Sequence, residues 1–305
     1  MRIGFGLPVS GAWASPQNIS HFATHAEQAG YASLWTFQRL LVPEGSAMEP
    51  VYHSVLDPVA ALAYTAAVTT RIRLGVAVIN APYISPGYVA KQAASIDVLS
   101  SGRLDLGLGL GWMPEEFVLT GAPMERRGAR TAEYIRALHV LWGEQPTEFS
   151  GEFYAVPRGT MLPRPVQPGG PPILLAGSSP VALRRAGRIA DGWVTSSRVN
   201  LATISKEIEI VRQAGAAEGR DPSALRIICR GVVRWDEPSI DASGHRRLLS
   251  GSKDQIREDV AWLAGQGVTE VFYDLNWDPL IGAPDANPGQ AADRAAVILD
   301  ALAPC

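Results

Sequence analysis

The chain has 305 residues, of which 47% are hydrophobic and 19% are charged, and its net charge is −3. This composition is typical of a globular protein with a sizeable core, and it excludes a basic field that would recruit nucleic acid or an anionic membrane. Cys229 and Cys305 are too few for a disulfide framework, and no apolar run has the length of a membrane span. We therefore expect a cytoplasmic protein.

Short apolar segments alternate with amphipathic segments along the whole chain. The expected strands are 2–6, 33–37, 74–79, 104–110, 172–176, 192–196, 226–234 and 268–275. The expected helices are 18–29, 58–69, 87–99, 131–142, 180–190, 202–218, 252–266 and 290–303. Strands that alternate with helices in this way predict an α/β fold, a (β/α)8 TIM barrel that occupies residues 1–305 as one domain. A doubly wound open sheet is the competing arrangement.

An insertion is expected between the fourth and fifth strands. Residues 147–156 have the pattern of a hairpin that turns at Ser150 and Gly151, and residues 157–172 are rich in proline and glycine. Such a stiff, long loop favours a lid or wall, which we expect at the C-terminal mouth of the barrel. A second loop, 279–288, is rich in Gly, Pro, Asp and Asn, and we expect it to be exposed.

The fourth strand ends in the run Gly107-Leu-Gly-Leu-Gly. It is not a dinucleotide fingerprint, because the third glycine of that motif falls on Trp112. Two interpretations remain. Gly109 and Gly111 either let the backbone approach a ligand closely or relieve crowding in a barrel strand.

The fifth strand ends at Ala176 and runs through Gly177, Ser178 and Ser179 into a helix that starts with Pro180. Free N–H groups, hydroxyls and the positive end of the helix dipole would suit a phosphate. Ordinary N-capping by Ser179 also explains the serines, and a capped helix start can hold an anion as well.

Groups for acid–base chemistry are few. His53 follows the second strand in a loop that would reach the mouth, and Glu116 follows the fourth strand. Each has a structural alternative, because a loop histidine is commonly solvated and a glutamate commonly occupies a helix start. No nucleophile elbow, phosphate loop or metal-binding spacing occurs, so we expect a cofactor to carry the chemistry.

Several motifs in order resemble those of the bacterial luciferase-like monooxygenase superfamily, and within it the F420-dependent oxidoreductases. The resemblance covers nearly the whole chain, and its motifs lie at residues 2–8, 29–35, 73–79, 90–104, 108–117 and 185–193. It implies a TIM barrel that holds coenzyme F420, or alternatively FMN, at its C-terminal mouth. The implied reaction is hydride transfer to or from a small organic substrate, and aromatic residues expected at the mouth suggest a hydrophobic one.

The resemblance also implies the positions that contact the cofactor. A non-prolyl cis peptide at Ala77–Val78 would support the face of the ring, and Asn80 would lie near its edge. The full implied set is Thr36, Phe37, Ala77, Val78, Asn80, Gly109, Gly111, Trp112, Ala176, Gly177, Ser178 and Ser179.

One departure from the family concerns the end of the second strand. Many F420-dependent relatives have Asp-His there, whereas this chain has Phe37 and Gln38. Neither residue transfers protons as histidine does, so His53 or Glu116 would do the proton work, or Gln38 would serve a reaction that needs none. Oxidation of a sugar phosphate or an alcohol with a histidine base is not expected.

Two alternatives stay open. The first is an FMN-dependent monooxygenase supplied with reduced flavin by a partner reductase, and the second is a catalytically silent flavin-binding barrel, which this departure favours. The resemblance further implies a homodimer, although no stretch of the sequence identifies an interface.

Overall fold

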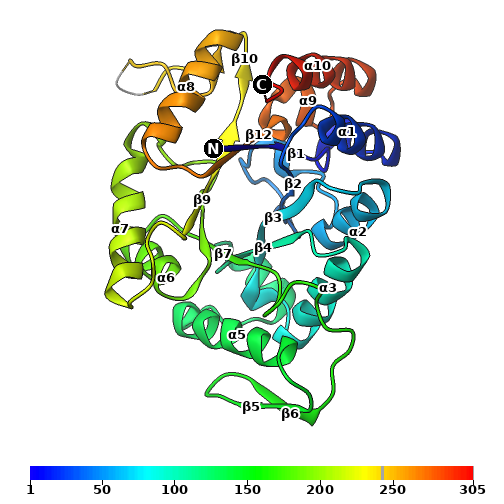
Figure 1. The fold of residues 1–305 in the computed structure, drawn as a ribbon. Coiled ribbons are helices and arrows are strands. Elements are labelled where there is room, and N and C mark those ends of the chain that lie inside the picture. The colour runs from blue at the N-terminus through cyan, green and yellow to red at the C-terminus, as the bar shows by residue number, and fades with distance from the viewer. Residues whose placement is uncertain (242–243, 305) are drawn as a thin grey trace.

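The computed structural model describes residues 1–241 and 244–304. Eight parallel strands close into a barrel in the order β1-β12-β9-β8-β7-β4-β3-β2, and helices surround it (Figure 1). The barrel strands are β1 (Arg2–Gly6), β2 (Ser33–Thr36), β3 (Arg73–Asn80), β4 (Leu104–Gly109), β7 (Ile173–Ala176), β8 (Gly192–Val194), β9 (Arg226–Val232) and β12 (Glu270–Asp274). Because β1 pairs with both β2 and β12, the sheet has no edges. The predicted (β/α)8 barrel is confirmed, and the open sheet is excluded.

The expected helices are all found, with ends that differ by a few residues. They are α1 (Pro16–Gln28), α2 (Pro58–Val68), α3 (Pro86–Leu99), α5 (Arg127–Trp142), α6 (Pro180–Ile189), α7 (Ile204–Ala217), α8 (Lys253–Gly265) and α10 (Pro288–Ala301). Several start at a capping residue followed by proline, as when the Asp57 side chain accepts the N–H of Ala60 and Pro58 opens α2. This local chemistry explains why the sequence predicts the helix starts well.

The insertion between β4 and β7 contains α4 (Pro114–Thr120), α5 and an antiparallel hairpin of β5 (Thr147–Ser150) and β6 (Ala155–Gly159). The proline-rich segment that follows does not line the mouth, so that prediction is wrong. Gln167 Nε2 donates to Asp97 Oδ1 at 2.7 Å and to the carbonyl of Leu104, at the start of β4, at 2.8 Å. Because β7 is parallel to β4, the chain has to return to the end of the barrel where both strands begin.

Two short features were not expected. β10 (Arg234–Trp235) pairs with β11 (Ser250–Gly251), and α9 (Pro279–Gly282) lies within the loop predicted to be exposed. Ile281 in α9 is fully buried, so that prediction is wrong for residues 281–283, although Pro279 and Leu280 are exposed as expected. Cys229 is buried as a free thiol, whereas Cys305 lies outside the described residues. In the described part of the chain, no helix has the length and apolar character needed to cross a bilayer.

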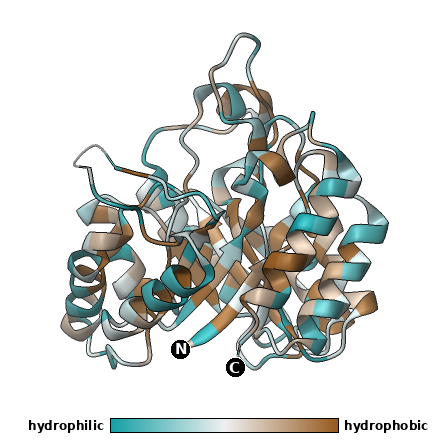
Figure 2. Cartoon of the chain, turned by 90° about the horizontal axis from the view of Figure 1, so that it is seen from above, coloured by the Kyte–Doolittle hydropathy of each residue, from teal (hydrophilic) through white to brown (hydrophobic). Residues whose placement is uncertain are grey.

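The interior of the barrel is filled by side chains from alternate strand positions. One residue from each of six strands forms an inner apolar cluster, which consists of Trp35, Ala77, Leu174, Val194, Ile228 and Phe272. The rings of Trp35 and Phe272 stack with centroids 5.0 Å apart. Gly75 makes room for them, because a Cβ there would lie 2.5 Å from the Trp35 ring. Figure 2 shows the hydrophobic strands in the middle of the molecule and both chain ends on one side of it.

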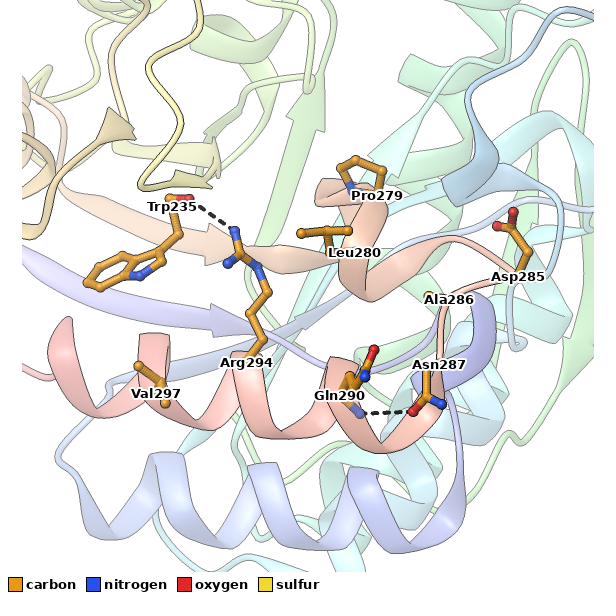
Figure 3. A pocket seen from close by; sticks show the side chains of 9 residues that line it. All are labelled: Trp235, Pro279, Leu280, Asp285, Ala286, Asn287, Gln290, Arg294 and Val297. Atoms are coloured by element: carbon orange, nitrogen blue, oxygen red, sulfur yellow. Dashed lines mark hydrogen bonds between the residues drawn. The ribbon is translucent and has the colours of Figure 1, made fainter.

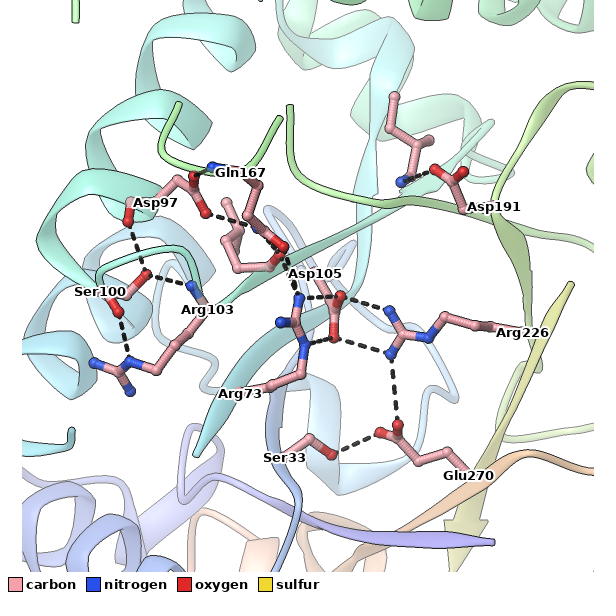
Figure 4. Close-up of polar contacts among 12 residues, drawn as sticks. Ser33, Arg73, Asp97, Ser100, Arg103, Asp105, Gln167, Asp191, Arg226 and Glu270 are labelled. Atoms are coloured by element: carbon pink, nitrogen blue, oxygen red, sulfur yellow. Dashed lines mark hydrogen bonds and ion pairs between the residues drawn. The ribbon is translucent and has the colours of Figure 1, made fainter. Parts of the chain in front are cut away.

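Below this apolar layer, at the end where the strands begin, lies a buried ionic cluster (Figure 4). Asp105, with no exposed surface, accepts two hydrogen bonds from Arg73, at 2.9 and 2.7 Å, and two from Arg226, at 2.6 and 2.9 Å. Glu270 continues the cluster by pairing with Arg2 at 2.9 Å and accepting the Ser33 hydroxyl at 2.6 Å. These contacts join strands from both halves of the barrel, which gives this end a stabilising role.

Asp105→Asn is expected to lower the free energy of unfolding by about 3 kcal/mol near neutral pH, because two arginines lose a buried partner. Burial acts to raise the pKa of Asp105, but the hydrogen bonds from Arg73 and Arg226 hold it below its ordinary value. A lowered carboxyl pKa contributes stability that is present above the unfolded pKa of about 4 and is lost as the pH falls below it.

Urea unfolding from about pH 7 down to about pH 3 therefore checks the prediction. The difference in free energy of unfolding between wild type and variant should become smaller in the acid range. The matched control is Asp293→Asn, an exposed carboxylate on α10, which should change stability by less than about 0.5 kcal/mol. A gap of the same size at every pH would contradict the proposed electrostatic origin.

Candidate active site at the mouth of the barrel

Three residues predicted from separate motifs meet where β2, β3 and β4 end. Gln38 Oε1 accepts the backbone N–H of Asn80 at 2.9 Å and its side-chain amide at 3.2 Å. Asn80 Oδ1 in turn accepts the N–H of Gly111 at 3.0 Å. Thr36, also predicted, is buried, and its hydroxyl donates to the Gly75 carbonyl at 3.3 Å. Gln38, Asn80 and Gly111 thus form one polar edge, which we call the amide edge.

An apolar surface lies beside the amide edge. The peptide bond between Ala77 and Val78 is cis, as the resemblance implies, and both residues belong to the inner apolar cluster or pack against it. Gly109 closes this surface, because a Cβ there would lie 2.6 Å from Val78 Cγ2 and 2.7 Å from Asn80 Oδ1. A side chain at this position would collide with both neighbours, so at Gly109 the crowding interpretation of the motif is confirmed, while the approach of a ligand stays a prediction.

The turn after β7 lies next to the end of β4, since these strands pair. Gly177 adopts a φ of +130°, and a Cβ there would lie 2.6 Å from Ala182 Cβ. Its carbonyl accepts the indole N–H of Trp193 at 2.8 Å, which holds the turn in place. Ser179 caps α6 by accepting the N–H of Ala182 at 3.3 Å, so its capping role is confirmed, and Ser178 is exposed. The start of α6 therefore remains open to an anion.

The two candidate proton carriers differ in environment. Glu116 on α4 is 1% exposed, and its Oε1 accepts the N–H of Leu40 at 2.9 Å and pairs with Arg39 at 3.0 Å. His53 is exposed, just after the 3₁₀ turn η2 (Pro50–Tyr52), with Nε2 3.2 Å from the Met48 carbonyl oxygen. Glu116 thus joins α4 to the loop after β2, while no contact among the described residues joins His53 to the amide edge.

Arginines and aromatic rings alternate along one side of the mouth. The Arg39 guanidinium lies 4.6 Å from the ring centroid of Tyr52 and 5.2 Å from that of Trp112. Trp112 is half-exposed, and a second guanidinium, that of Arg198 in the loop after β8, lies 6.0 Å from its ring centroid. Arg198 also pairs with Glu49 at 3.1 Å. Trp112, predicted from its glycine-rich neighbours, is therefore held between two cations.

Deeper in the mouth lies a second buried ion pair. Arg230 pairs with Asp274 at 2.6 Å, and its guanidinium lies 4.6 Å from the ring centroid of Phe37. Arg230 also donates to the carbonyl of Ala77 at 3.3 Å, so it contacts the backbone of the apolar surface. Arg39, Arg230 and Asp274 were not among the predicted residues. A signal existed for Arg230, since a charge that interrupts an apolar strand needs a buried partner.

The chain is similar in sequence to known proteins. Residues 3–243 match the protein family described as luciferase-like monooxygenase. The chain belongs to this family. It is 37% identical over 283 residues to an uncharacterized protein of Mycobacterium tuberculosis, with 89% of each chain covered. It is also 30% identical over 250 residues to the F420-dependent glucose-6-phosphate dehydrogenase of Kineococcus radiotolerans, covering 80% of this chain and 71% of that one.

The fold also matches solved structures. A monooxygenase from Streptomyces bottropensis superimposes with a TM-score of 0.77 at 23% identity, covering 99% of this chain and 98% of that one. The coenzyme F420-dependent tetrahydromethanopterin reductase of Methanopyrus kandleri gives a TM-score of 0.75 at 17% identity, with the same coverage. The family and its dehydrogenase relatives identify this luciferase-like protein as an oxidoreductase.

Unpartnered donors at the mouth test whether the residues fit a bound cofactor or substrate. Arg39 Nε, the Tyr83 hydroxyl and Trp277 Nε1 are buried and lack a hydrogen-bond partner within the described structure. Buried donors of this kind are rare in folded proteins and need an acceptor. Together with the glycine-lined amide edge and the open start of α6, they fit a flat polar ligand with an anionic tail.

A pocket of about 590 Å³ lies elsewhere, between β10 and helices α9 and α10 (Figure 3). Arg294 spans it, donating to the carbonyl of Trp235 at 3.0 Å and pairing with Asp278 at 2.9 Å. None of the predicted site residues lines this pocket. The Arg294 side chain is thus already engaged, so the mouth remains the better candidate site.

Glu116→Ala is expected to lower the free energy of unfolding by about 3 kcal/mol, because Arg39 would remain buried without its partner. The amides of Leu40 and Leu41 should also exchange faster with solvent deuterium, since both donate to Glu116 Oε1. Urea unfolding and amide exchange measure the two effects. Glu115→Ala, at the exposed neighbouring position, is the matched control, and equal effects in both variants would contradict the bridging role.

Proposed function

We propose that this protein is an F420-dependent oxidoreductase that transfers a hydride between the deazaflavin and a small, hydrophobic organic substrate. The observation that carries the proposal is the amide edge beside the apolar Ala77–Val78 surface, with the Gly177 turn on the neighbouring strand. This arrangement suits a flat ring whose phosphate lies at a helix start. The relatives named as F420-dependent dehydrogenases support the choice of cofactor.

In this proposal each part of the mouth has a separate task. The bound cofactor supplies a two-electron hydride carrier. Gln38 and Asn80 orient the edge of the ring, while Gly109 and Gly111 allow the backbone to come close to it. The first turn of α6, with Ser178 and Ser179, holds the phosphate. The remaining proposed contacts are Thr36, Phe37, Ala77, Val78, Trp112, Ala176 and Gly177.

The proton has to come from a group other than residue 38, because an amide does not transfer protons as histidine does. Glu116 is occupied by Arg39 and the N–H of Leu40, and His53 is exposed and bonded to its own loop. We therefore assign Glu116 a positioning role and place no proton step on His53. The substrate is proposed to differ from a sugar phosphate for the same reason.

A second candidate is an FMN-dependent monooxygenase that receives reduced flavin from a partner reductase. The observation in its favour is the family match itself, whose description names monooxygenases. A catalytically silent flavin-binding barrel is the third candidate, favoured by Phe37 and Gln38. A homodimer and a single domain over residues 1–305 also remain proposals.

Oxidised F420 is expected to bind the purified protein with a dissociation constant of about 1 μM or less, and FMN about tenfold more weakly. Fluorescence quenching or calorimetry measures both. A preference for FMN, with oxygen uptake once reduced flavin is supplied, would instead support the monooxygenase. Tight F420 binding without turnover across a substrate panel would support the silent barrel, and binding of neither cofactor would overturn all three.

Gly177→Ala is expected to weaken cofactor binding about tenfold, because the new Cβ would clash with Ala182 and displace the start of α6. The control is Gly219→Ala, where φ is also positive, at +73°, but nothing lies within 4 Å of the added carbon. Both changes strain the backbone, so only a loss of cofactor affinity that occurs in Gly177→Ala and not in Gly219→Ala reports on the phosphate site. Equal affinities in the two variants would count against that site.

A further inference from the structure

We infer that Arg39 and Tyr83 form a donor pair that binds the substrate oxygen on which negative charge develops during hydride transfer. The substrate class is then an organic carbonyl compound, or the corresponding alcohol in the reverse direction. This inference rests on the proposed function, because it assigns the substrate end of the same site.

Arg39 has a buried donor, Nε, that none of its contacts among the described residues uses. Its side chain is 6% exposed, and one terminal nitrogen pairs with Glu116 at 3.0 Å and lies 3.6 Å from Met113 Sδ. Contacts with Tyr52 and Trp112 fix the guanidinium, yet Nε is buried without a hydrogen-bond partner in the described structure. A fixed, desolvated cation with an unused N–H is suited to a developing oxyanion.

Tyr83 supplies the second donor from the 3₁₀ turn η3 (Ala81–Tyr83), directly after β3. Its ring packs edge-on against Phe117 with centroids 5.0 Å apart, and its hydroxyl lies 2.6 Å from the position that a Cβ on Gly111 would take. The hydroxyl is buried and unpartnered among the described residues. The Glu116 carboxylate is its nearby acidic neighbour.

Both donors lie beside the Glu116 carboxylate, which pairs with Arg39 at 3.0 Å and also acts on the ionisation of Tyr83. Arg39 directly follows Gln38, and Tyr83 lies against Gly111, so each is next to one member of the amide edge. Burial and the nearby Glu116 carboxylate also raise the pKa of Tyr83 above its ordinary value, which keeps the phenol protonated and able to donate. Glu116 then positions both donors, by pairing with one and repelling the ionised form of the other.

The chemical step balances with these groups, solvent water and the reduced cofactor as reductant. The carbonyl carbon would accept the hydride from the C–H bond that breaks in the reduced cofactor and form a new C–H bond, while the π electron pair of the C=O bond moves onto oxygen. Arg39 Nε–H and the Tyr83 hydroxyl donate hydrogen bonds to that oxygen, and the Tyr83 proton passes to it. Water then returns a proton to the phenolate. In the reverse direction the alcohol loses its proton through Tyr83, which explains why the site needs no histidine at position 38.

Calorimetric titration with benzoate, an aromatic oxyanion, and with benzyl alcohol, a neutral probe of similar size, tests the pair in the cofactor-loaded protein. Wild type is expected to bind benzoate about tenfold more tightly than benzyl alcohol. Tyr83→Phe and Arg39→Lys should each weaken benzoate about tenfold and leave benzyl alcohol unchanged, since each removes one donor. Lysine keeps a cation opposite Glu116, so this variant is expected to fold.

The matched control is Tyr134→Phe, which removes another buried, unpartnered hydroxyl, on α5 and without a contact to Arg39 or Glu116 among the described residues. It should leave both affinities as in wild type. Equal benzoate affinity in wild type and both site variants, or an equal loss in the control, would overturn the inference. Titrations of the cofactor-free protein distinguish failure of the proposed function from failure of the donor pair. If neither F420 nor FMN binds, the proposed function is overturned. The benzoate affinities of wild type and variants still test the donor pair.

Discussion

The alternation of side chains along eight parallel strands, once the sheet is closed, decides which residues share the interior of this barrel. Positions two apart on one strand fall at the floor, the middle and the mouth. On β9, for example, Arg226 lies at the floor, Ile228 in the middle and Arg230 at the mouth. The corresponding residues are Glu270, Phe272 and Asp274 on β12, and Ser33, Trp35 and Phe37 on and just after β2. The floor carries charge, the middle is apolar, and the mouth is charged again. Closure thus separates two ionic clusters by a dry layer.

Each buried charge in these clusters has a partner, as desolvation requires. At the floor, Asp105 satisfies two arginines and joins distant strands, which serves stability. At the mouth, Arg230 and Asp274 form a similar pair, but Arg230 also reaches the Ala77 carbonyl. Buried ion pairs therefore stabilise one end of the barrel and shape the surface of the candidate site at the other. In this fold the floor commonly serves stability and the mouth commonly carries the active site.

The departure from the family at Phe37 and Gln38 is explained by what these residues contact. Phe37 is 3% exposed and packs against Arg230, and Gln38 holds Asn80 in the amide edge. Both positions therefore serve the architecture of the mouth. Arg39, the next residue along the chain, is fixed between two rings and Glu116.

The sequence by itself determined the types and order of the elements, because capping residues, proline and apolar periodicity act locally. It also predicted that residues after different strands would meet, as Gln38, Asn80 and Gly111 do, since parallel strands in a barrel end on the same side. Only the tertiary structure decided how Arg39 meets Glu116, which donors remain unpartnered, and that the proline-rich segment returns to the floor. Such pairings depend on the closure and register of the sheet and on burial, which no local pattern encodes.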